Sequence, residues 1–350
     1  MEITDIQEEG YERVARCKDP ESGLHAVISV HSTVLGPSLG GLRMWPYTSE
    51  DEALYDVLRL SRGMTYKSAV AQTGLGGGKA VIIGDPKTVK SESLYLAMGR
   101  FIESLDGKYI TAEDVNTTIR DLEIVRRATS HVTGLSEADG GSGNPSPYTA
   151  YGVFLGIRAA LGWQLGNDDL AGRTVALQGV GAVGSHLCQR LVEHGAEVTI
   201  ADRNQVRVQG LVEKLGVKSV PESEILSQEC DVLAPCALGA IINDQTIPHL
   251  RCKILAGATN NPLEERRHGV ELDERNILYA PDYVINAGGI INVSTELMPG
   301  GFNKESSLMR IERIPQALKE LWTIAKEENI APNVASNRLA EKILADAIPS

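Results

Sequence analysis

The 350-residue sequence has no apolar run near the ~18 residues that a membrane-spanning helix requires. Its N-terminal segment MEITDIQEEG is acidic and has no apolar core of the kind found in secretory signals. Basic residues are outnumbered by acidic ones, which gives a net charge of −12 at pH 7. Such a charge provides no broad basic surface for nucleic acid or an anionic membrane. We therefore expect a cytoplasmic protein that binds neither.

Cysteine and histidine are sparse and follow no metal-binding or disulfide pattern. The five cysteines form no CxxC pair, and their number is odd: Cys17, Cys188, Cys230, Cys236 and Cys252. This usage predicts reduced thiols rather than a disulfide framework. The seven histidines show no metal-ligand spacing, so no metal is predicted.

The length of the chain predicts two domains, since one hydrophobic core rarely serves 350 residues. In the first part, apolar patterns predict strands at 24–35, 79–84 and 109–111, and helices at 49–63 and 91–105. Ser49 is the expected N-cap of the first helix. The glycine-rich segment at 36–41 is expected to interrupt the first strand. This half is therefore predicted to be mixed α/β.

A segment rich in turn-forming residues at 136–148 is the expected interdomain hinge. A helix near Thr149 follows it, and then a strand–helix–strand pattern. Strands are expected at 173–178, 196–202, 232–234, 253–256 and 277–279, and residues 306–347 are expected to be mostly helical. Alternating strands and helices predict a Rossmann-type, doubly wound parallel sheet.

A GxGxxG fingerprint lies between the first strand and the first helix of this pattern. Asp202 ends the next strand, 23 residues after Gly179. The glycines allow a tight turn and close approach of a pyrophosphate, and the helix N-terminus attracts phosphate charge. Asp202 can accept hydrogen bonds from ribose hydroxyls and would repel a 2′-phosphate, which favours NAD over NADP, although the neighbouring Arg203 could pair with a phosphate. The expected contacts of this turn are Gly179, Val180, Gly181, Ala182, Val183, Gly184, Asp202 and Arg203.

Two lysines and an aspartate in the first half stand out from the surface lysines that most chains carry. Lys79 lies between a triple glycine and an apolar strand, where burial favours the neutral amine and makes lysine a usable base. Lys67 follows the segment RGMTY, and Asp114 follows a short strand as a possible acid–base partner.

Eight segments together resemble the glutamate/leucine/phenylalanine/valine dehydrogenase family, in family order and over nearly the whole chain. They are GGLRMW at 40–45, GMTYK at 63–67, GGGK at 76–79, YITAEDV at 109–115, SGNPSP at 142–147, PCALG at 235–239, NN at 260–261 and PDYVINAGG at 281–289. Within the family, the sequence is most similar to the leucine dehydrogenases. The resemblance implies NAD-dependent, reversible oxidative deamination of an amino acid to its 2-oxo acid with release of ammonia.

The resemblance also implies a role for each of the three residues. Lys67 would hold the substrate carboxylate, Lys79 would activate water as general base, and Asp114 would carry protons to and from the amino group. Asn261 would lie near the substrate amine, and Thr149, Cys236, Ala237 and Asn260 would contact the cofactor. The backbone near Gly40 and Gly41 would shape the carboxylate end of the pocket, and an apolar side-chain pocket would be lined by Leu39, Gly40, Met64, Ala112, Ile290 and Val293. Such a lining favours leucine, isoleucine or valine over glutamate.

Some segments depart from the leucine pattern. GAVG at 181–184, DVN at 114–116 and LRLS at 58–61 are more similar to phenylalanine and tryptophan dehydrogenases. An aromatic amino-acid dehydrogenase is therefore the alternative, and a catalytically inactive nucleotide-binding sensor is a remote one. The short C-terminus leaves a homo-oligomer open as dimer or octamer. The expected domains are a substrate-binding and catalytic, oligomerisation-type domain at 1–140 with a C-terminal helix at about 330–350, and an NAD-binding domain at 148–328.

Overall fold

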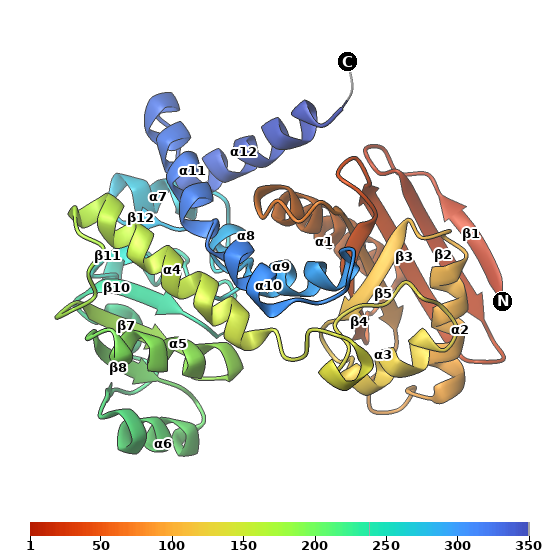
Figure 1. Cartoon of the computed structure of the whole chain (residues 1–350), viewed down its shortest axis with the longest axis horizontal. Coiled ribbons are helices and arrows are strands. Elements are labelled where there is room, and N and C mark those ends of the chain that lie inside the picture. Colours follow the sequence, from red (N-terminus) through yellow and green to blue (C-terminus); the bar gives the residue numbers. More distant parts are fainter. Residues whose placement is uncertain (238, 349–350) are drawn as a thin grey trace. The chain divides into compact units, whose positions relative to one another are not determined.

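The computed structural model describes residues 1–237 and 239–348, without the side chain of Asp139. The chain divides into two compact units (Figure 1). The first comprises Met1–Asn144, Val293–Lys304 and the segment from Ala340 on, and the second comprises Pro145–Asn292 and Glu305–Leu339. The last two residues of the C-terminal helix expected at about 330–350 lie outside the described residues.

The first unit is built on a mixed six-stranded sheet with the order β1-β2-β3-β5-β4-β6. Its strands are β1 (Glu2–Ile6), β2 (Arg13–Asp19), β3 (Leu24–Ser32), β4 (Ser38–Trp45), β5 (Gly76–Ile83) and β6 (Tyr109–Glu113). The pairs β1–β2, β2–β3 and β3–β5 are antiparallel, whereas β4 runs parallel to both β5 and β6. The expected mixed α/β character of this half is thereby confirmed.

Helices cover both faces of this sheet. They are α1 (Glu50–Val70) on one face, and α2 (Glu92–Glu103) and α3 (Ile119–Arg126) on the other. Alternate residues of β3 serve the two faces, since Ile28 packs with the α2 side and Val27 with the α1 side. The larger core lies on the α2 side and buries Tyr95, Phe101 and Tyr109 almost completely.

Two expectations for this half need correction. The first strand does end before residue 36, at Ser32, but only residues 36–37 of the segment at 36–41 lie outside the sheet, because residues 38–41 begin β4. Hydrogen bonding to β5 on one side and β6 on the other overrides the low strand preference of glycine. The first helix does not end at residue 63, because α1 continues to Val70 and carries Met64 and Lys67. Its N-cap is Ser49, as expected, which accepts the N–H of Glu52 at 3.1 Å.

The second unit contains an all-parallel six-stranded sheet, which confirms the Rossmann-type prediction. Its order is β12-β11-β10-β7-β8-β9, so the strand order reverses between β7 and β10. The strands are β7 (Thr174–Gln178), β8 (Glu197–Ala201), β9 (Lys218–Ser219), β10 (Cys230–Pro235), β11 (Cys252–Leu255) and β12 (Leu278–Tyr279). In open parallel sheets, such a reversal is where ligands bind.

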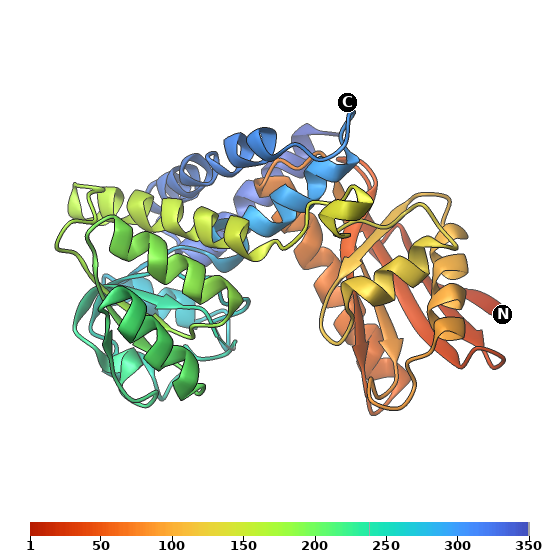
Figure 2. The same ribbon diagram turned by 60° about the horizontal axis from the view of Figure 1, so that its bottom comes forward.

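The helices of the second unit pack around this sheet, with α4 lying against α5 and α11 (Figure 2). The longer ones are α4 (Ser146–Leu165), α5 (Ala182–Glu193), α6 (Gln205–Leu215) and α11 (Ile314–Glu328). The shorter ones are α7 (His268–Glu274) and α8 (Asp282–Ile285). Further along the chain, α9 (Gly288–Ser294), α10 (Lys304–Ile311) and α12 (Pro332–Asp346) each span a division between the units.

Short 3-10 turns complete the secondary structure: η1 (Glu137–Asp139), η2 (Ile225–Ser227), η3 (Ile247–His249) and η4 (Thr295–Leu297). None of the helices in the described residues combines the length and the apolar character that crossing a membrane would take.

Candidate active site

A buried ion pair joins Lys79 and Asp114, the two acid–base residues that the sequence predicts. Lys79 Nζ lies 2.5 Å from Asp114 Oδ2, and only 6% of the lysine side chain is exposed. Burial alone would raise the pKa of Asp114, but Lys79 and Arg43 hold that pKa below its usual range. Asp114 is therefore a carboxylate near neutral pH, placed to exchange a proton with an adjacent group.

The glycines of β4 allow this pair to form. Gly41 is the register partner of Ala112 on β6, two residues before Asp114. A Cβ at position 41 would lie 2.6 Å from the Cβ of Asp114, so a larger residue would displace the carboxylate. Leu39, which is 2% exposed, pairs with Ile110 two positions earlier on the same strands. Leu39, Gly41 and Ala112 therefore share one face of the sheet.

Helix α1 covers the face that carries Lys79. Ser29 is the register partner of Lys79, and its Oγ lies 2.8 Å from that of Ser61 on α1. Met64 and Lys67 are half-buried and follow on the same helix, with Lys67 in its last turn. The lysine predicted to bind a carboxylate thus comes from a helix, whereas the predicted base comes from a strand.

The predicted pocket residues Ile290 and Val293 both belong to α9. Ile290 is half-buried in the second unit, whereas Val293 is 9% exposed and belongs to the first. The carbonyl oxygen of Val293 accepts the hydroxyl of Thr133 at 3.3 Å. Thr133 in turn hydrogen-bonds to β6 through Thr111, which ties this end of α9 to the strand that leads to Asp114.

Glu296 has a positioning role that the sequence pattern did not reveal. Its Oε2 accepts the Thr133 hydroxyl at 2.7 Å and the N–H of Gly134 at 2.9 Å. Its Oε1 accepts the N–H of Ser142 at 2.7 Å. One carboxylate therefore fixes the chain just before its passage into the second unit. The partners are more than 150 residues apart, so no local pattern could indicate them.

In the second unit, the GxGxxG turn joins β7 to α5 with a close backbone approach. Gly179 follows β7 with φ of 88°, and Gly181 is the N-cap of α5 without a side-chain capping bond. A Cβ on Gly184 would lie 2.0 Å from the carbonyl oxygen of Gly179. The first N–H groups of α5, from Ala182 and Val183 on, are therefore offered to a ligand rather than to a capping side chain.

Asp202 lies beside this turn, where a ribose is expected. Its Oδ2 accepts the N–H of Val180 at 2.7 Å, and its Oδ1 accepts the N–H of Asn204 at 2.7 Å. The neighbouring Arg203 has a largely exposed side chain and pairs with Glu222 at 3.2 Å. Arg207, which the sequence reading overlooked, approaches the turn, with Nη1 4.0 Å from the position that a Cβ on Gly181 would take.

Loops at the ends of β10 and β11 bring the remaining predicted cofactor residues together. The N–H of Cys236 donates to Gln178 at the end of β7 at 2.7 Å. Ala237 accepts the hydroxyl of Thr259 at 3.3 Å, so the loop after β10 contacts the loop that carries Asn260 and Asn261. Burial of the Cys236 thiol raises its pKa to about 12, which agrees with a packing role rather than nucleophilic chemistry.

Two further residues hold the asparagine loop, and both lie in the segment PDYVINAGG at 281–289, where the sequence predicted a role for neither of them. Asp282 Oδ2 accepts the N–H of Asn261 at 2.8 Å, where the backbone has φ of 48°. Asn286 donates from Nδ2 to Asn260 Oδ1 at 2.8 Å.

Thr149 lies in the first turn of α4, where its hydroxyl donates to the carbonyl oxygen of Pro145 at 3.2 Å.

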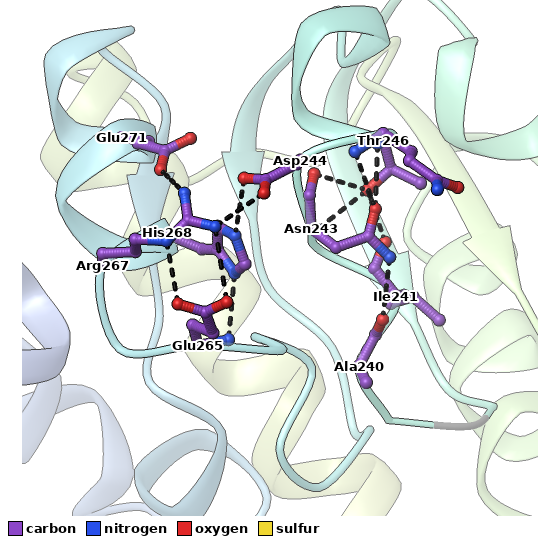
Figure 3. Close-up of polar contacts among 10 residues, drawn as sticks. Ala240, Ile241, Asn243, Asp244, Thr246, Glu265, Arg267, His268 and Glu271 are labelled. Carbon is purple, nitrogen blue, oxygen red and sulfur yellow. Dashed lines mark hydrogen bonds and ion pairs between the residues drawn. The ribbon is translucent and has the colours of Figure 1, made fainter.

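Asp244, His268 and Glu271 form one group whose ligand atoms all lie within 4.8 Å of one another (Figure 3). Arg267 occupies its centre and pairs with Asp244 at 2.7 Å and with Glu271 at 2.7 Å. His268 Nδ1 accepts the N–H of Glu265 at 2.9 Å, which leaves Nε2 facing Asp244 at 3.2 Å. Because a guanidinium already neutralises these carboxylates, the group is an ion-pair network that ties α7 to the loop after β10.

Comparisons with known proteins agree with this geometry. The model of the Glu/Leu/Phe/Val dehydrogenase dimerisation domain matches residues 11–131, and that of the Glutamate/Leucine/Phenylalanine/Valine dehydrogenases matches 140–206 and 199–349. A leucine dehydrogenase of Geobacillus stearothermophilus is 54% identical over 95% of this chain and 90% of its own. One of Thermoactinomyces intermedius is 51% identical over 98% of this chain and 93% of its own.

Among solved structures, L-tryptophan dehydrogenase from Nostoc punctiforme superposes with a TM-score of 0.87 and 42% identity, covering 97% of both chains. The family resemblance that the eight sequence segments indicated is therefore confirmed. The chain belongs to the glutamate/leucine/phenylalanine/valine dehydrogenase family.

Proposed function

We propose that this protein catalyses the NAD-dependent, reversible oxidative deamination of a branched-chain L-amino acid, with leucine preferred and isoleucine and valine also accepted. The products are the 2-oxo acid, ammonium and NADH, and the oxygen of the new carbonyl comes from water. The observation that carries the proposal is the buried pair of Lys79 and Asp114 beside Gly41, in a chain whose curated relatives at 51–54% identity are named leucine dehydrogenases.

The roles of the three polar residues follow from their chemistry. Lys67 pairs with the substrate carboxylate, which orients the Cα–H bond. Lys79 takes a proton from the water that attacks the imine carbon, and Asp114 exchanges protons with the departing amino group. The 2.5 Å contact holds the lysine amine and the carboxylate at a fixed separation, so that Lys79 can act on the water while Asp114 acts on the amino group.

The cofactor residues fit NAD. Gly179–Gly184 provide the close turn and the uncapped helix end for the pyrophosphate, and Asp202 accepts from the ribose hydroxyls. A phosphate on the 2′-oxygen would meet the carboxylate of Asp202, and the nearby Arg203 is engaged by Glu222. When bound, the nicotinamide accepts the hydride that leaves the substrate Cα. Thr149, Cys236, Ala237, Asn260 and Asn261 are proposed to hold the remainder of the cofactor and the substrate amine.

The side-chain pocket is proposed to be apolar, since its residues carry no charge for a second carboxylate: Leu39, Gly40, Gly41, Met64, Ala112, Ile290 and Val293. Such a lining separates leucine from glutamate strongly, because a buried carboxylate would lack a partner. It separates leucine from valine only weakly, since one methylene contributes ~1–3 kcal/mol to discrimination, and leucine from its isomer isoleucine only by shape.

An aromatic amino-acid dehydrogenase is the second candidate. It is supported by the similarity to the tryptophan dehydrogenase structure at 42% identity and by the GAVG, DVN and LRLS segments. The experiment that separates the two candidates is a panel of leucine, isoleucine, valine, phenylalanine and tryptophan, each with NAD and with NADP. Highest kcat/KM for leucine with NAD supports the proposal, and highest kcat/KM for an aromatic substrate overturns it.

We further propose that the protein is a homo-oligomer, a dimer or an octamer, formed through the first unit. The description of the family model over residues 11–131 as a dimerisation domain supports this. A cytoplasmic location is proposed as well, because each of the five cysteines lies in the described chain as a free thiol.

A further inference from the structure

Arg43 contacts the candidate acid–base pair through Asp114. It is on β4, where it pairs in register with Val81, and Val81 belongs to the face of the sheet that α1 covers. Its Nε donates to Asp114 Oδ2 at 3.2 Å, the same oxygen that Lys79 contacts at 2.5 Å. Asp114 therefore faces two cations, one from each of two neighbouring strands.

The other end of the same guanidinium is anchored to α1. Arg43 Nη1 donates to Asp56 Oδ2 at 2.9 Å. Asp56 also accepts the hydroxyl of Tyr47 at 2.7 Å and the Nη2 of Arg59 at 2.9 Å, and its side chain is only 15% exposed. With partners on both sides, the planar guanidinium has one orientation, and that orientation aims Nε at Asp114.

The charged groups near Asp114 have unequal effects. Lys79 on β5 and Arg43 on β4 favour its ionised form, whereas Glu113 beside it on β6 and Asp56 behind Arg43 are negative. Tyr109 on β6 is also nearby, with burial keeping its phenol protonated. Arg43 cannot lose its charge at any pH at which the enzyme folds, unlike Lys79, whose proton is exchanged in the proposed reaction.

We propose that Arg43 is a positioning residue for this reaction, which keeps the Asp114 carboxylate ionised and in place while Lys79 is neutral and ready to take the proton of the attacking water. This inference rests on the proposed function. When Lys79 is neutral, it no longer stabilises the nearby carboxylate, and Arg43 is then the remaining cation in contact with it. Without Arg43, Asp114 would take the proton that the lysine releases, and the pair would be held in an unproductive state.

The pH profile is the readout that separates this role from a merely structural one. Removing a permanent cation raises the proton affinity of every nearby group, so the acid limb of kcat/KM moves to higher pH whichever member of the coupled pair it reports. We expect Arg43→Met to move that limb up by about one pH unit or more. Arg43→Lys retains the charge and should leave the limb near its wild-type position while lowering kcat, because an ammonium cannot contact both carboxylates.

Two further variants complete the design. Asp56→Asn removes the anchor of Arg43 but leaves its charge, so it should lower kcat without an upward movement of the acid limb. Arg16→Met is the matched control, since Arg16 pairs with Glu50 at 2.5 Å and joins β2 to α1 in the same unit, away from Asp114. It should cost stability but leave the pH profile unchanged.

The measurement is the oxidation of leucine followed by NADH absorbance between pH 6 and pH 11, with unfolding monitored in parallel to confirm that each variant is folded. If folded Arg43→Met has an unchanged acid limb, and the wild-type protein oxidises leucine, the role of Arg43 is overturned and the proposed function stands. If Arg43→Met does not fold, the charge-retaining variant decides: an acid limb that moves to higher pH in folded Arg43→Lys, although the charge is retained, contradicts the inference. Absence of leucine oxidation in the wild type contradicts the proposed function instead.

Discussion

The carboxylate of Asp202 accepts the N–H of Val180 at 2.7 Å and so joins the end of β8 to the glycine turn that follows β7. This places the acid of the fingerprint on the turn itself, as well as beside the expected ribose. The observed contact with the turn and the proposed contact with the ribose are roles that a substitution can separate, since an asparagine keeps the acceptor oxygen but removes the charge.

For the cofactor, we predict that Asp202→Asn raises KM for NAD by about tenfold, because a hydrogen bond to a charged group contributes ~1.5–3 kcal/mol. The loss of charge should also lower the preference for NAD over NADP. Initial rates with both cofactors check this. Asp231→Asn is the control, since Asp231 pairs with Lys253 on the same sheet. An unchanged ratio of kcat/KM for the two cofactors would contradict the assignment of Asp202 as the discriminating residue.

For catalysis, Lys79→Ala is predicted to lower kcat by about a hundredfold to ten-thousandfold, the usual contribution of a positioned acid–base group. NAD affinity should be retained, because the cofactor turn belongs to the second unit. Lys90→Ala is a matched control, as Lys90 pairs with Asp121 at 2.7 Å in the same unit. Substantial turnover by Lys79→Ala would show that another group is the base.

For stability, Glu296→Ala leaves the N–H groups of Gly134 and Ser142 and the hydroxyl of Thr133 without their acceptor. We predict a loss of about 1–3 kcal/mol in the free energy of unfolding, measured by urea denaturation. Glu296→Gln keeps one acceptor oxygen and should lose less. Equal stability of the alanine variant and the wild type would mean that water replaces the carboxylate without cost.

For pH dependence, Glu50 at the start of α1 is held by Lys18, Arg16 and His25, which lower its pKa from 4.5 to about 2. A carboxyl group whose pKa is lower in the folded state stabilises the protein above its unfolded pKa, and this contribution disappears as the pH falls toward the folded pKa. Glu50→Gln should therefore lower Tm at pH 7, and the difference from wild type should shrink below pH 4.5 and vanish near pH 2. A difference that stays constant with pH would exclude an electrostatic origin.

Local patterns in the sequence predicted some parts of the molecule well. They predicted the capping role of Ser49, the strand–turn–helix at 174–193 and the parallel sheet. These features follow from the period of apolar residues, from helix capping and from turn-forming residues, all of which act over a few residues. Strand β4 could not be predicted in this way. Its glycines favour a turn locally, and only pairing with β5 and β6 makes that backbone extended.

The polar groups that hold the candidate site were also beyond the reach of local patterns. Arg43 and Asp114 are 71 residues apart, and Glu296 and Ser142 are 154 apart. The sequence predicted which residues carry the chemistry, because Lys67, Lys79 and Asp114 lie in segments that resemble those of a known family. It could not identify the partners that orient them, because these contacts arise only when distant strands and helices pack together.

The measurement that tests the account most directly is the rate of NAD reduction by the purified protein with leucine as the substrate. The account predicts leucine-dependent formation of NADH with stoichiometric release of ammonium and the 2-oxo acid, with kcat/KM for leucine above that for phenylalanine, tryptophan and glutamate. No NADH formation with any of these amino acids, or a clear preference for an aromatic one, would contradict it.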